Sequence, residues 1–157
     1  MEKIQKTNVA RLLDAAGIQY ELVPYSFSED DLSAQHVAKE LGENIDQVFK
    51  TLVLKGDKTG CFVCVIPGDF EVDLKIAAKI SGNKNCEMLH MKELLPTTGY
   101  IRGGCSPIGM KKQFPTYIHE SCLLYAFIYV SAGIRGLQLK INPKDLISYI
   151  SAGLYPI

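Results

Sequence analysis

A lysine opens one of the most apolar stretches of the chain, where its ammonium group could meet a ligand. If residues 50–54 form a strand, alternation places Lys50 on the same face as Leu52 and Leu54, whose side chains point inward. An ammonium group directed toward a core is costly unless it is paired or meets an anionic ligand. The alternative is a strand-end lysine whose stem packs on the protein while its charged head reaches solvent.

A glycine-rich loop with neither helical nor strand periodicity follows later in the chain: Gly103-Gly104-Cys105-Ser106-Pro107. Paired glycines let a backbone approach a ligand closely, and turned N–H groups can hold an anion or a carbonyl oxygen. The flanking cations are Arg102, Lys111 and Lys112. The alternative is a structural turn that binds nothing. The loop is not a nucleophile elbow, because its spacing departs from Gly-x-Ser-x-Gly by one residue.

A second candidate segment presents a hydroxyl and a guanidinium group. A predicted strand ends at Ser131, and glycines at 133 and 136 flank the turn that carries Arg135. The two groups could stand at the mouth of a site. The alternative is an ordinary hairpin with a solvated arginine.

Thiol and imidazole chemistry has little support from spacing. Cys61 and Cys64 look like a CxxC pair, but an odd separation within a strand puts their thiols on opposite faces. Cys105 is the one thiol beside a candidate site, and the sequence places no histidine near it to lower its pKa. The histidines and cysteines make no complete metal set. We therefore expect no metal, no cofactor and no catalytic triad.

The elements that must position these residues alternate between helix and strand. Apolar spacing and capping residues predict helices at residues 9–16, 33–41, 73–80 and 142–150, with a short helical turn at 92–95 that ends before Pro96. Alternation and apolar runs predict strands at residues 18–24, 50–54, 61–66, 116–119, 127–131 and 137–141. This pattern predicts an α+β fold, a mixed sheet of about seven strands with helices packed outside it.

Composition is typical of one globular domain over residues 1–157, with 47% hydrophobic and 22% charged residues. The formal net charge of zero argues against binding nucleic acid by bulk charge. Charge is uneven, however, because residues 1–80 carry a net −4 and residues 81–157 a net +4. The longest apolar run, nine residues, is too short to span a membrane. Scattered cysteines and no secretory signal indicate a reduced, cytoplasmic protein.

Three motifs in order make the chain similar to a known family. They are Phe-Lys-Thr-Leu-Val at 49–53, the glycine-rich loop within 99–112, and Tyr-Val-Ser-Ala-Gly-Ile-Arg-Gly-Leu at 129–137. The chain resembles the YbaK/EbsC family of free-standing aminoacyl-tRNA deacylases, relatives of the editing domain inserted in bacterial prolyl-tRNA synthetase. The likeness covers essentially the whole chain. It implies a barrel-like mixed sheet with surrounding helices, and hydrolysis of the ester that joins a wrong amino acid to a tRNA 3′ end.

The resemblance also implies residue roles. Lys50 matches the family lysine that holds the terminal adenosine and its phosphate, and Gly103 and Gly104 match the loop whose backbone faces the aminoacyl carbonyl. The positions that match the substrate pocket are Ser106, Pro107, Ser131 and, by a looser alignment, Tyr25. Ser33 stands where some members carry a pocket phenylalanine, which leaves the amino-acid preference open. We add Arg135 to the predicted substrate-binding residues because of its turn.

The implied substrate is Cys-tRNA(Pro), with alanyl or seryl esters as alternatives. In the cysteine branch the substrate's own thiol attacks its carbonyl, so the protein orients the ester and stabilises the oxyanion. In members acting on alanine, a water positioned by a tRNA hydroxyl attacks instead. Two other classes stay open: a non-catalytic module that binds a nucleotide or tRNA end, and a thiol enzyme that uses Cys105.

The implied partners are the mischarged tRNA 3′ end and, transiently, prolyl-tRNA synthetase. The predicted tRNA contacts are Arg102, Lys111 and Lys112, all in the positively charged second half. We expect a monomer or weak homodimer with no membrane association.

Overall fold

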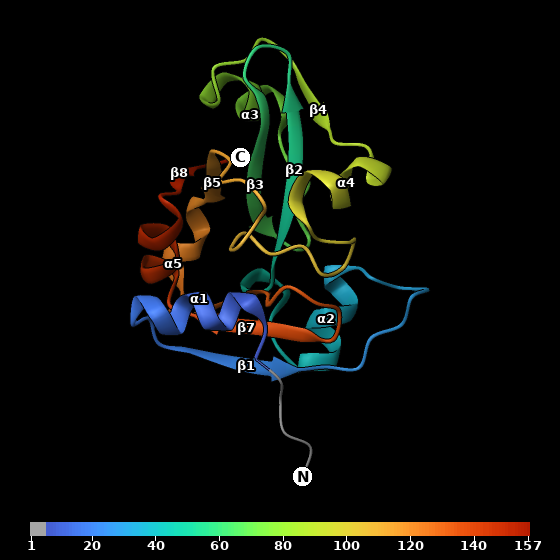
Figure 1. The fold of residues 1–157 in the computed structure, drawn as a ribbon, viewed down its shortest axis with the longest axis vertical. Coiled ribbons are helices and arrows are strands. Elements are labelled where there is room, and N and C mark those ends of the chain that lie inside the picture. Colours follow the sequence, from blue (N-terminus) through green and yellow to red (C-terminus); the bar gives the residue numbers. More distant parts are fainter. Residues whose placement is uncertain (1–5) are drawn as a thin grey trace.

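The computed structural model describes residues 6–157, which contain eight strands in two sheets (Figure 1). The strands are β1 (Tyr20–Pro24), β2 (Phe49–Gly56), β3 (Gly60–Pro67), β4 (Cys86–Met88), β5 (Thr116–His119), β6 (Ile128–Ser131), β7 (Leu137–Ile141) and β8 (Gly153–Tyr155). One sheet has the order β1-β7-β6 and the other the order β4-β2-β3-β5-β8. In Figure 1, β2 and β3 run vertically, whereas β1 and β7 cross below them.

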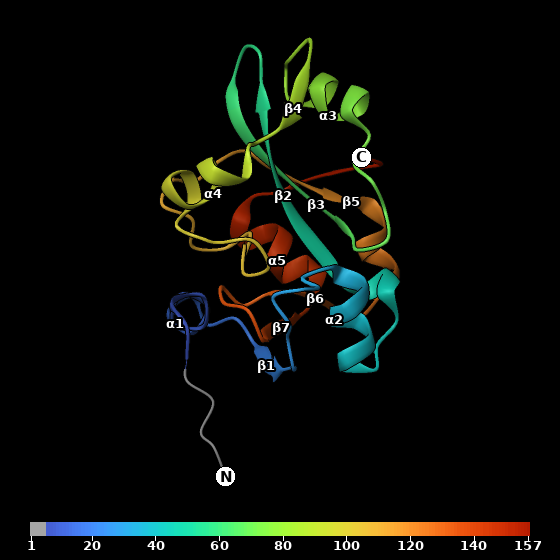
Figure 2. The same cartoon turned by 90° about the vertical axis from the view of Figure 1, so that its right-hand side faces the viewer.

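Helices surround the two sheets (Figure 2). They are α1 (Asn8–Ala16), α2 (Ala34–Leu41), α3 (Leu74–Ile80), α4 (Met91–Thr98) and α5 (Pro143–Ile150), with 3₁₀ turns η1 (Ile45–Gln47) and η2 (Glu120–Leu124). The predicted caps are confirmed, since the side chains of Ser33, Asp73 and Asn142 each accept a hydrogen bond from a backbone N–H of their helix. In Figure 2, α1 and α2 flank the three-stranded sheet, while α3 and α4 lie beside the upper part of the five-stranded sheet.

Strand β3 is buried on both faces, as its apolar run predicts. Val63 and Val65 lie in the larger hydrophobic cluster, which reaches the three-stranded sheet, and Cys64 lies in a second cluster on the opposite face. Cys61 packs against the first cluster. The prediction that the two thiols lie on opposite faces is therefore confirmed.

The α+β prediction is confirmed, but the prediction of one barrel-like sheet of about seven strands is wrong. The two sheets do not close into a barrel, and an isolated bridge joins Val48, the residue before β2, to Tyr129 of β6. Strands β4 and β8 form the open edges of the larger sheet. Each has only three residues, which is too short for a period of two to be recognised in the sequence.

Helix α4 continues through Pro96, where the sequence predicted its end. A proline inside a helix loses one N–H donor, which would serve the carbonyl four residues earlier. Here that carbonyl belongs to the exposed Lys92, where water can replace the missing donor. The last turn is closed by Thr98, whose hydroxyl donates to the Leu94 carbonyl at 2.7 Å, and by Gly99, whose N–H donates to the Leu95 carbonyl at 2.8 Å.

Helix lengths in residues 6–157 bear on the membrane prediction. The longest helix, α1, has nine residues, and none of those described is long and apolar enough to cross a membrane. The predicted lack of a secretory signal falls largely on residues 1–5, which lie outside the described residues.

The turn between β2 and β3 is held by one buried amide. The Asn83 side chain accepts hydrogen bonds of 2.9 Å from the N–H groups of Lys58 and Thr59. It also donates to the hydroxyl oxygens of Thr59 and Ser81, both at 2.8 Å. A single side chain thus joins the turn to the end of α3.

We expect Asn83→Ala to lower the free energy of unfolding by about 2 kcal/mol, because it leaves several of these groups unpaired. Chemical denaturation measures the change. The matched control is Asn85→Ala, which removes an exposed side chain nearby and should change stability by less than about 0.5 kcal/mol. Equal losses in the two variants would contradict the assignment to the buried amide.

Candidate functional site

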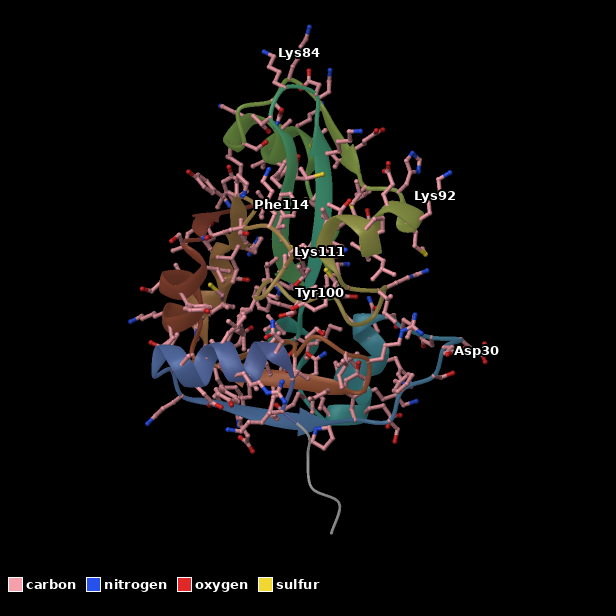
Figure 3. The ribbon with its side chains drawn as sticks, in the orientation of Figure 1. Asp30, Lys84, Lys92, Tyr100, Lys111 and Phe114 are labelled. Atoms are coloured by element: carbon pink, nitrogen blue, oxygen red, sulfur yellow. The ribbon has the colours of Figure 1, made fainter. Side chains whose placement is uncertain are left out.

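A cavity of about 330 Å³ opens where the two sheets, α2 and the glycine-rich loop meet. Its polar lining includes Lys50, Thr51, Ser33, Gln35, Arg102, Cys105, Ser131 and Gln138, together with the backbone of Gly68 and Gly103. These residues come from β2, α2, β6, β7 and three loops, so the cavity depends on the tertiary fold. Figure 3 shows Tyr100 and Lys111 on the loop that follows α4 and crosses in front of β2 and β3.

Lys50 is placed in the cavity by the ladder between β2 and β3. It pairs with Ile66 and shares a strand face with Leu54, which is buried in the second cluster. Burial lowers the pKa of the Lys50 ammonium group below its ordinary value of 10.5, and the charges of Glu71 and Asp69 partly offset this shift. Lys50 is therefore a half-buried cation that lines a cavity rather than a lysine that extends fully into solvent.

Two residues that line the cavity each carry a buried side-chain oxygen with no partner within residues 6–157, the hydroxyl Oγ1 of Thr51 and the amide Oε1 of Gln138. The Gln138 side chain belongs to a residue that is only 5% exposed, and its neighbour across the β6–β7 ladder is Ser131. An unpaired buried acceptor costs about 1–3 kcal/mol unless water or a ligand satisfies it. The free protein therefore carries an unsatisfied acceptor on each of two residues that line the cavity.

Sequence reasoning missed both of these residues. Thr51 belongs to the motif at residues 49–53, in which only Lys50 was predicted to be a site residue. Gln138 and Lys140 share the face of β7 opposite to Leu137, Leu139 and Ile141, which lie in the larger cluster. Alternation alone predicts a solvent-facing Gln138, so the sequence carries no signal of its burial.

The paired glycines allow the loop to lie tightly against its neighbours. Gly103 has a φ of 86°, in the left-handed region that glycine adopts readily. A Cβ atom on Gly104 would lie 3.2 Å from backbone atoms of Ile134 and Arg135, which is a tight contact, so the second glycine permits the close approach of these segments. The two glycines therefore serve different physical needs.

The remainder of the loop is fastened from behind the cavity. Ser106 is fully buried, and its hydroxyl accepts a hydrogen bond of 3.2 Å from the Ile108 N–H. The Tyr100 hydroxyl donates to the Ile108 carbonyl. Burial raises the pKa of Tyr100 to about 12, so this hydroxyl stays protonated and remains a donor near neutral pH.

Cys105 lines the cavity, but its environment does not favour a nucleophile. Burial raises the pKa of its thiol to about 12, far above neutral pH. The thiolate is the reactive form of cysteine, and here it is scarce. The thiol-enzyme alternative therefore loses its main support.

The structure brings together some of the predicted site residues and separates others. Lys50, Gly103, Ser33, Ser131 and Arg102 line one cavity. The remaining predicted residues are not among those that line it: Gly104, Ser106, Pro107, Tyr25, Arg135, Lys111 and Lys112.

The positions of these remaining residues have simple physical causes. Tyr25 packs with the apolar cluster under α2, and Pro107 and Lys112 line a separate cavity behind the loop. Arg135 packs against the glycine-rich loop, where its Nε donates to the Arg102 carbonyl. Lys111 is exposed on the same loop (Figure 3).

The cavity offers cations and neutral polar groups rather than an acid–base pair. Of the described residues, none that lines it is His, Asp or Glu. Over residues 6–157 no group of three or more such side chains and cysteines is placed to hold a metal ion. Lys50 and Arg102 can bind an anion, while the unpaired oxygens can accept from a cationic or neutral donor.

The electrostatic setting of Lys50 is directly measurable. NMR titration of isotopically labelled lysine should give Lys50 a pKa below 10.5. Glu71→Gln should lower this pKa further, because it removes the larger of the two favourable charges. Glu87→Gln, on the edge strand β4, is the control and should leave it unchanged. A pKa at or above 10.5 in the free protein would contradict the described burial.

Comparison with known proteins shows that the part of the chain that forms the cavity is similar to a known family. A family model described as an aminoacyl-tRNA editing domain matches residues 29–149, which include every residue that lines the cavity. The chain is 55% identical to EbsC of Enterococcus faecalis, over 92% of this chain and 88% of that protein. The name of EbsC describes it as a candidate Cys-tRNA(Pro)/Cys-tRNA(Cys) deacylase.

Two further similarities are more distant. YwhH of Bacillus subtilis, whose name states no activity, is 24% identical over 78% of both chains. A crystal structure described as that of a candidate trans-editing enzyme for prolyl-tRNA synthetase superposes with a TM-score of 0.82. It covers 96% of this chain and 97% of its own at 24% identity, so the likeness shows the shared fold.

Proposed function

Because the chain belongs to the aminoacyl-tRNA editing domain family, we propose that it deacylates mischarged tRNA, with Cys-tRNA(Pro) as its principal substrate. The resemblance seen in the sequence is confirmed at the level of the family. One observation carries the proposal. A half-buried lysine and two unpaired oxygens share a cavity that no described His, Asp or Glu lines.

The cationic side of the cavity suits the 3′ end of the tRNA. Lys50 and Arg102 can hold the phosphate of the terminal nucleotide, Lys50 as a point charge and Arg102 through its planar fork. The first residues of α2 lie on the same wall, where the positive end of the helix dipole favours an anion. These groups hold the nucleotide while the aminoacyl group enters the cavity.

The neutral side of the cavity suits the amino acid. The Thr51 hydroxyl oxygen and the Gln138 amide oxygen can accept hydrogen bonds from the α-ammonium group of the ester. A cavity of about 330 Å³ is at the small end of ligand sites, which favours a small side chain beside the terminal ribose. The wall thus recognises an amino acid without a carboxylate of its own.

The proposed chemistry uses the substrate's own thiol. The cysteinyl sulfur attacks the ester carbonyl, the bond to the ribose oxygen breaks, and the thiol proton passes to the departing tRNA hydroxyl. The product is a thiolactone, which water hydrolyses. The protein contributes orientation and a backbone donor to the carbonyl oxygen as negative charge develops, for which the Gly103 backbone is the candidate.

We propose that the rest of the tRNA is bound outside the cavity. Lys111 and Lys112 lie on the same loop as Arg102, and we assign them to the acceptor stem of the tRNA, next to the terminal nucleotide that Arg102 holds. The zero net charge supports a partner that supplies the remaining tRNA affinity, and we assign this role to prolyl-tRNA synthetase.

The central test is amino-acid release from cysteinyl-, alanyl-, seryl- and prolyl-tRNA(Pro). We expect the wild type to clear cysteine, Lys50→Ala to lose at least about a hundredfold in kcat/KM, and Cys105→Ser to keep its activity. The ester of 2-aminobutyrate, in which a methyl group replaces the thiol, should resist cleavage.

Three outcomes would count against the proposal. Loss of activity in Cys105→Ser would indicate a protein thiol as the nucleophile. Rapid cleavage of the aminobutyryl ester would indicate attack by water. If no ester is cleaved even with prolyl-tRNA synthetase present, the binding-module alternative takes its place.

Gln138 allows a test in which stability and activity should change in opposite directions. Gln138→Met removes an unpaired buried oxygen at similar size, so the free energy of unfolding should stay equal or rise. The same change should lower kcat/KM by roughly tenfold to a hundredfold, because the bond to the ammonium group is lost. Gln19→Met, at an exposed position, is the control and should alter neither. Unchanged kcat/KM in Gln138→Met would contradict the assigned contact.

A further inference from the structure

We propose that Arg135 aims the Gly103 N–H into the cavity and is thereby a positioning residue for the deacylation. This inference rests on the proposed function. It changes the role expected of Arg135 from a direct contact with substrate to control of the peptide that faces the substrate.

Arg135 holds the glycine-rich loop by one well-placed hydrogen bond. Its Nε donates to the Arg102 carbonyl at 2.8 Å. Its Nη1 also lies 3.8 Å from Glu29 Oε1, but that carboxylate is 82% exposed and contributes little. Arg135 is not among the residues that line the cavity, so it acts on the loop from outside.

The planar geometry of the peptide carries this contact through to the cavity. The Arg102 carbonyl and the Gly103 N–H belong to one peptide unit, and no cis bond occurs in the described chain. In a planar trans peptide the N–H points opposite to the C=O. Fixing the carbonyl toward Arg135 therefore turns the Gly103 N–H away from Arg135, and both residues of this peptide, Arg102 and Gly103, line the cavity.

The Gly103 N–H is one of the free donors of this loop, and it belongs to the peptide that Arg135 holds. The Gly104 N–H donates to the Ile101 carbonyl at 3.0 Å and is occupied. Within residues 6–157 the Gly103 N–H has no acceptor of its own. A donor that is fixed in direction and unused in the free protein is suited to a developing oxyanion.

The two glycines make such a constraint necessary. Glycine has a wide choice of backbone angles, so the peptide between Arg102 and Gly103 could rotate if nothing held it. A Cβ at position 103 would meet Leu32 Cδ2 at 3.0 Å, whereas Arg135 Cγ and Nε would lie 3.4 Å away, at the edge of ordinary contact. The turn that carries Arg135 is itself anchored, since the Gly136 carbonyl accepts a 2.9 Å bond from the Tyr25 N–H.

The substitution Arg135→Lys tests the hydrogen bond separately from the charge. In a lysine, the Cε carbon occupies the place that Nε has in arginine, so Arg135→Lys keeps the positive charge but loses the donor at this point. Arg135→Met removes both the charge and the donor at similar length. Glu29→Gln removes the exposed ion pair and leaves the hydrogen bond to Arg102 intact.

The test measures kcat and KM separately for cysteinyl-tRNA(Pro) cleavage by the wild type and these three variants. We expect Arg135→Lys and Arg135→Met to lower kcat at least about tenfold with KM changed less than about threefold, because an oxyanion donor acts in the transition state. Glu29→Gln should match the wild type. Thermal unfolding of each variant checks the fold, and if Arg135→Met does not fold, Arg135→Lys carries the same test.

The contrary outcomes are distinct. Full activity in Arg135→Lys would overturn the inference in favour of charge alone. A raised KM with unchanged kcat would overturn it in favour of direct substrate binding. A wild type that cleaves no ester would overturn the proposed function and this inference with it, whereas an active wild type with fully active variants overturns the inference alone.

Discussion

The ladder between β2 and β3 is the constraint on which the remaining structure depends. It pairs eight residues of each strand, and its period of two sends Val53 into one hydrophobic cluster and Leu54 into the other. Lys50 has the same parity as Leu54 and stands where the apolar contacts of that face give way to the cavity. A shift of one residue in this register would exchange the two faces and remove the ammonium group from the cavity.

Local patterns in the sequence predicted much of what the ladder and its surroundings contain. Lys50, the glycine-rich loop and Ser131 could be found because each breaks the periodicity of its own segment. The helices were found from their caps and apolar spacing. Such features are decided within a few residues of the chain and do not require knowledge of the fold.

Other features were decided by contacts between distant segments. The division into two open sheets depends on edge strands of three residues, for which alternation gives no signal. The side of the turn on which Arg135 lies is set by a carbonyl 33 residues earlier in the chain. Gln138 lies on the face of β7 that alternation predicts to be solvent-facing, and it is buried beside the cavity only in the folded structure. Tertiary placement, rather than propensity, determines all three.

The burial of Cys105 has a consequence for the durability of the protein. Peroxides and disulfides react with the thiolate form, and a thiol with a pKa of about 12 supplies very little of it near neutral pH. In the presence of an oxidant such as peroxide, a reactive thiol in a cavity that admits cysteinyl groups would be open to a mixed disulfide with the substrate. By keeping the Cys105 sulfur protonated, its surroundings slow that oxidation.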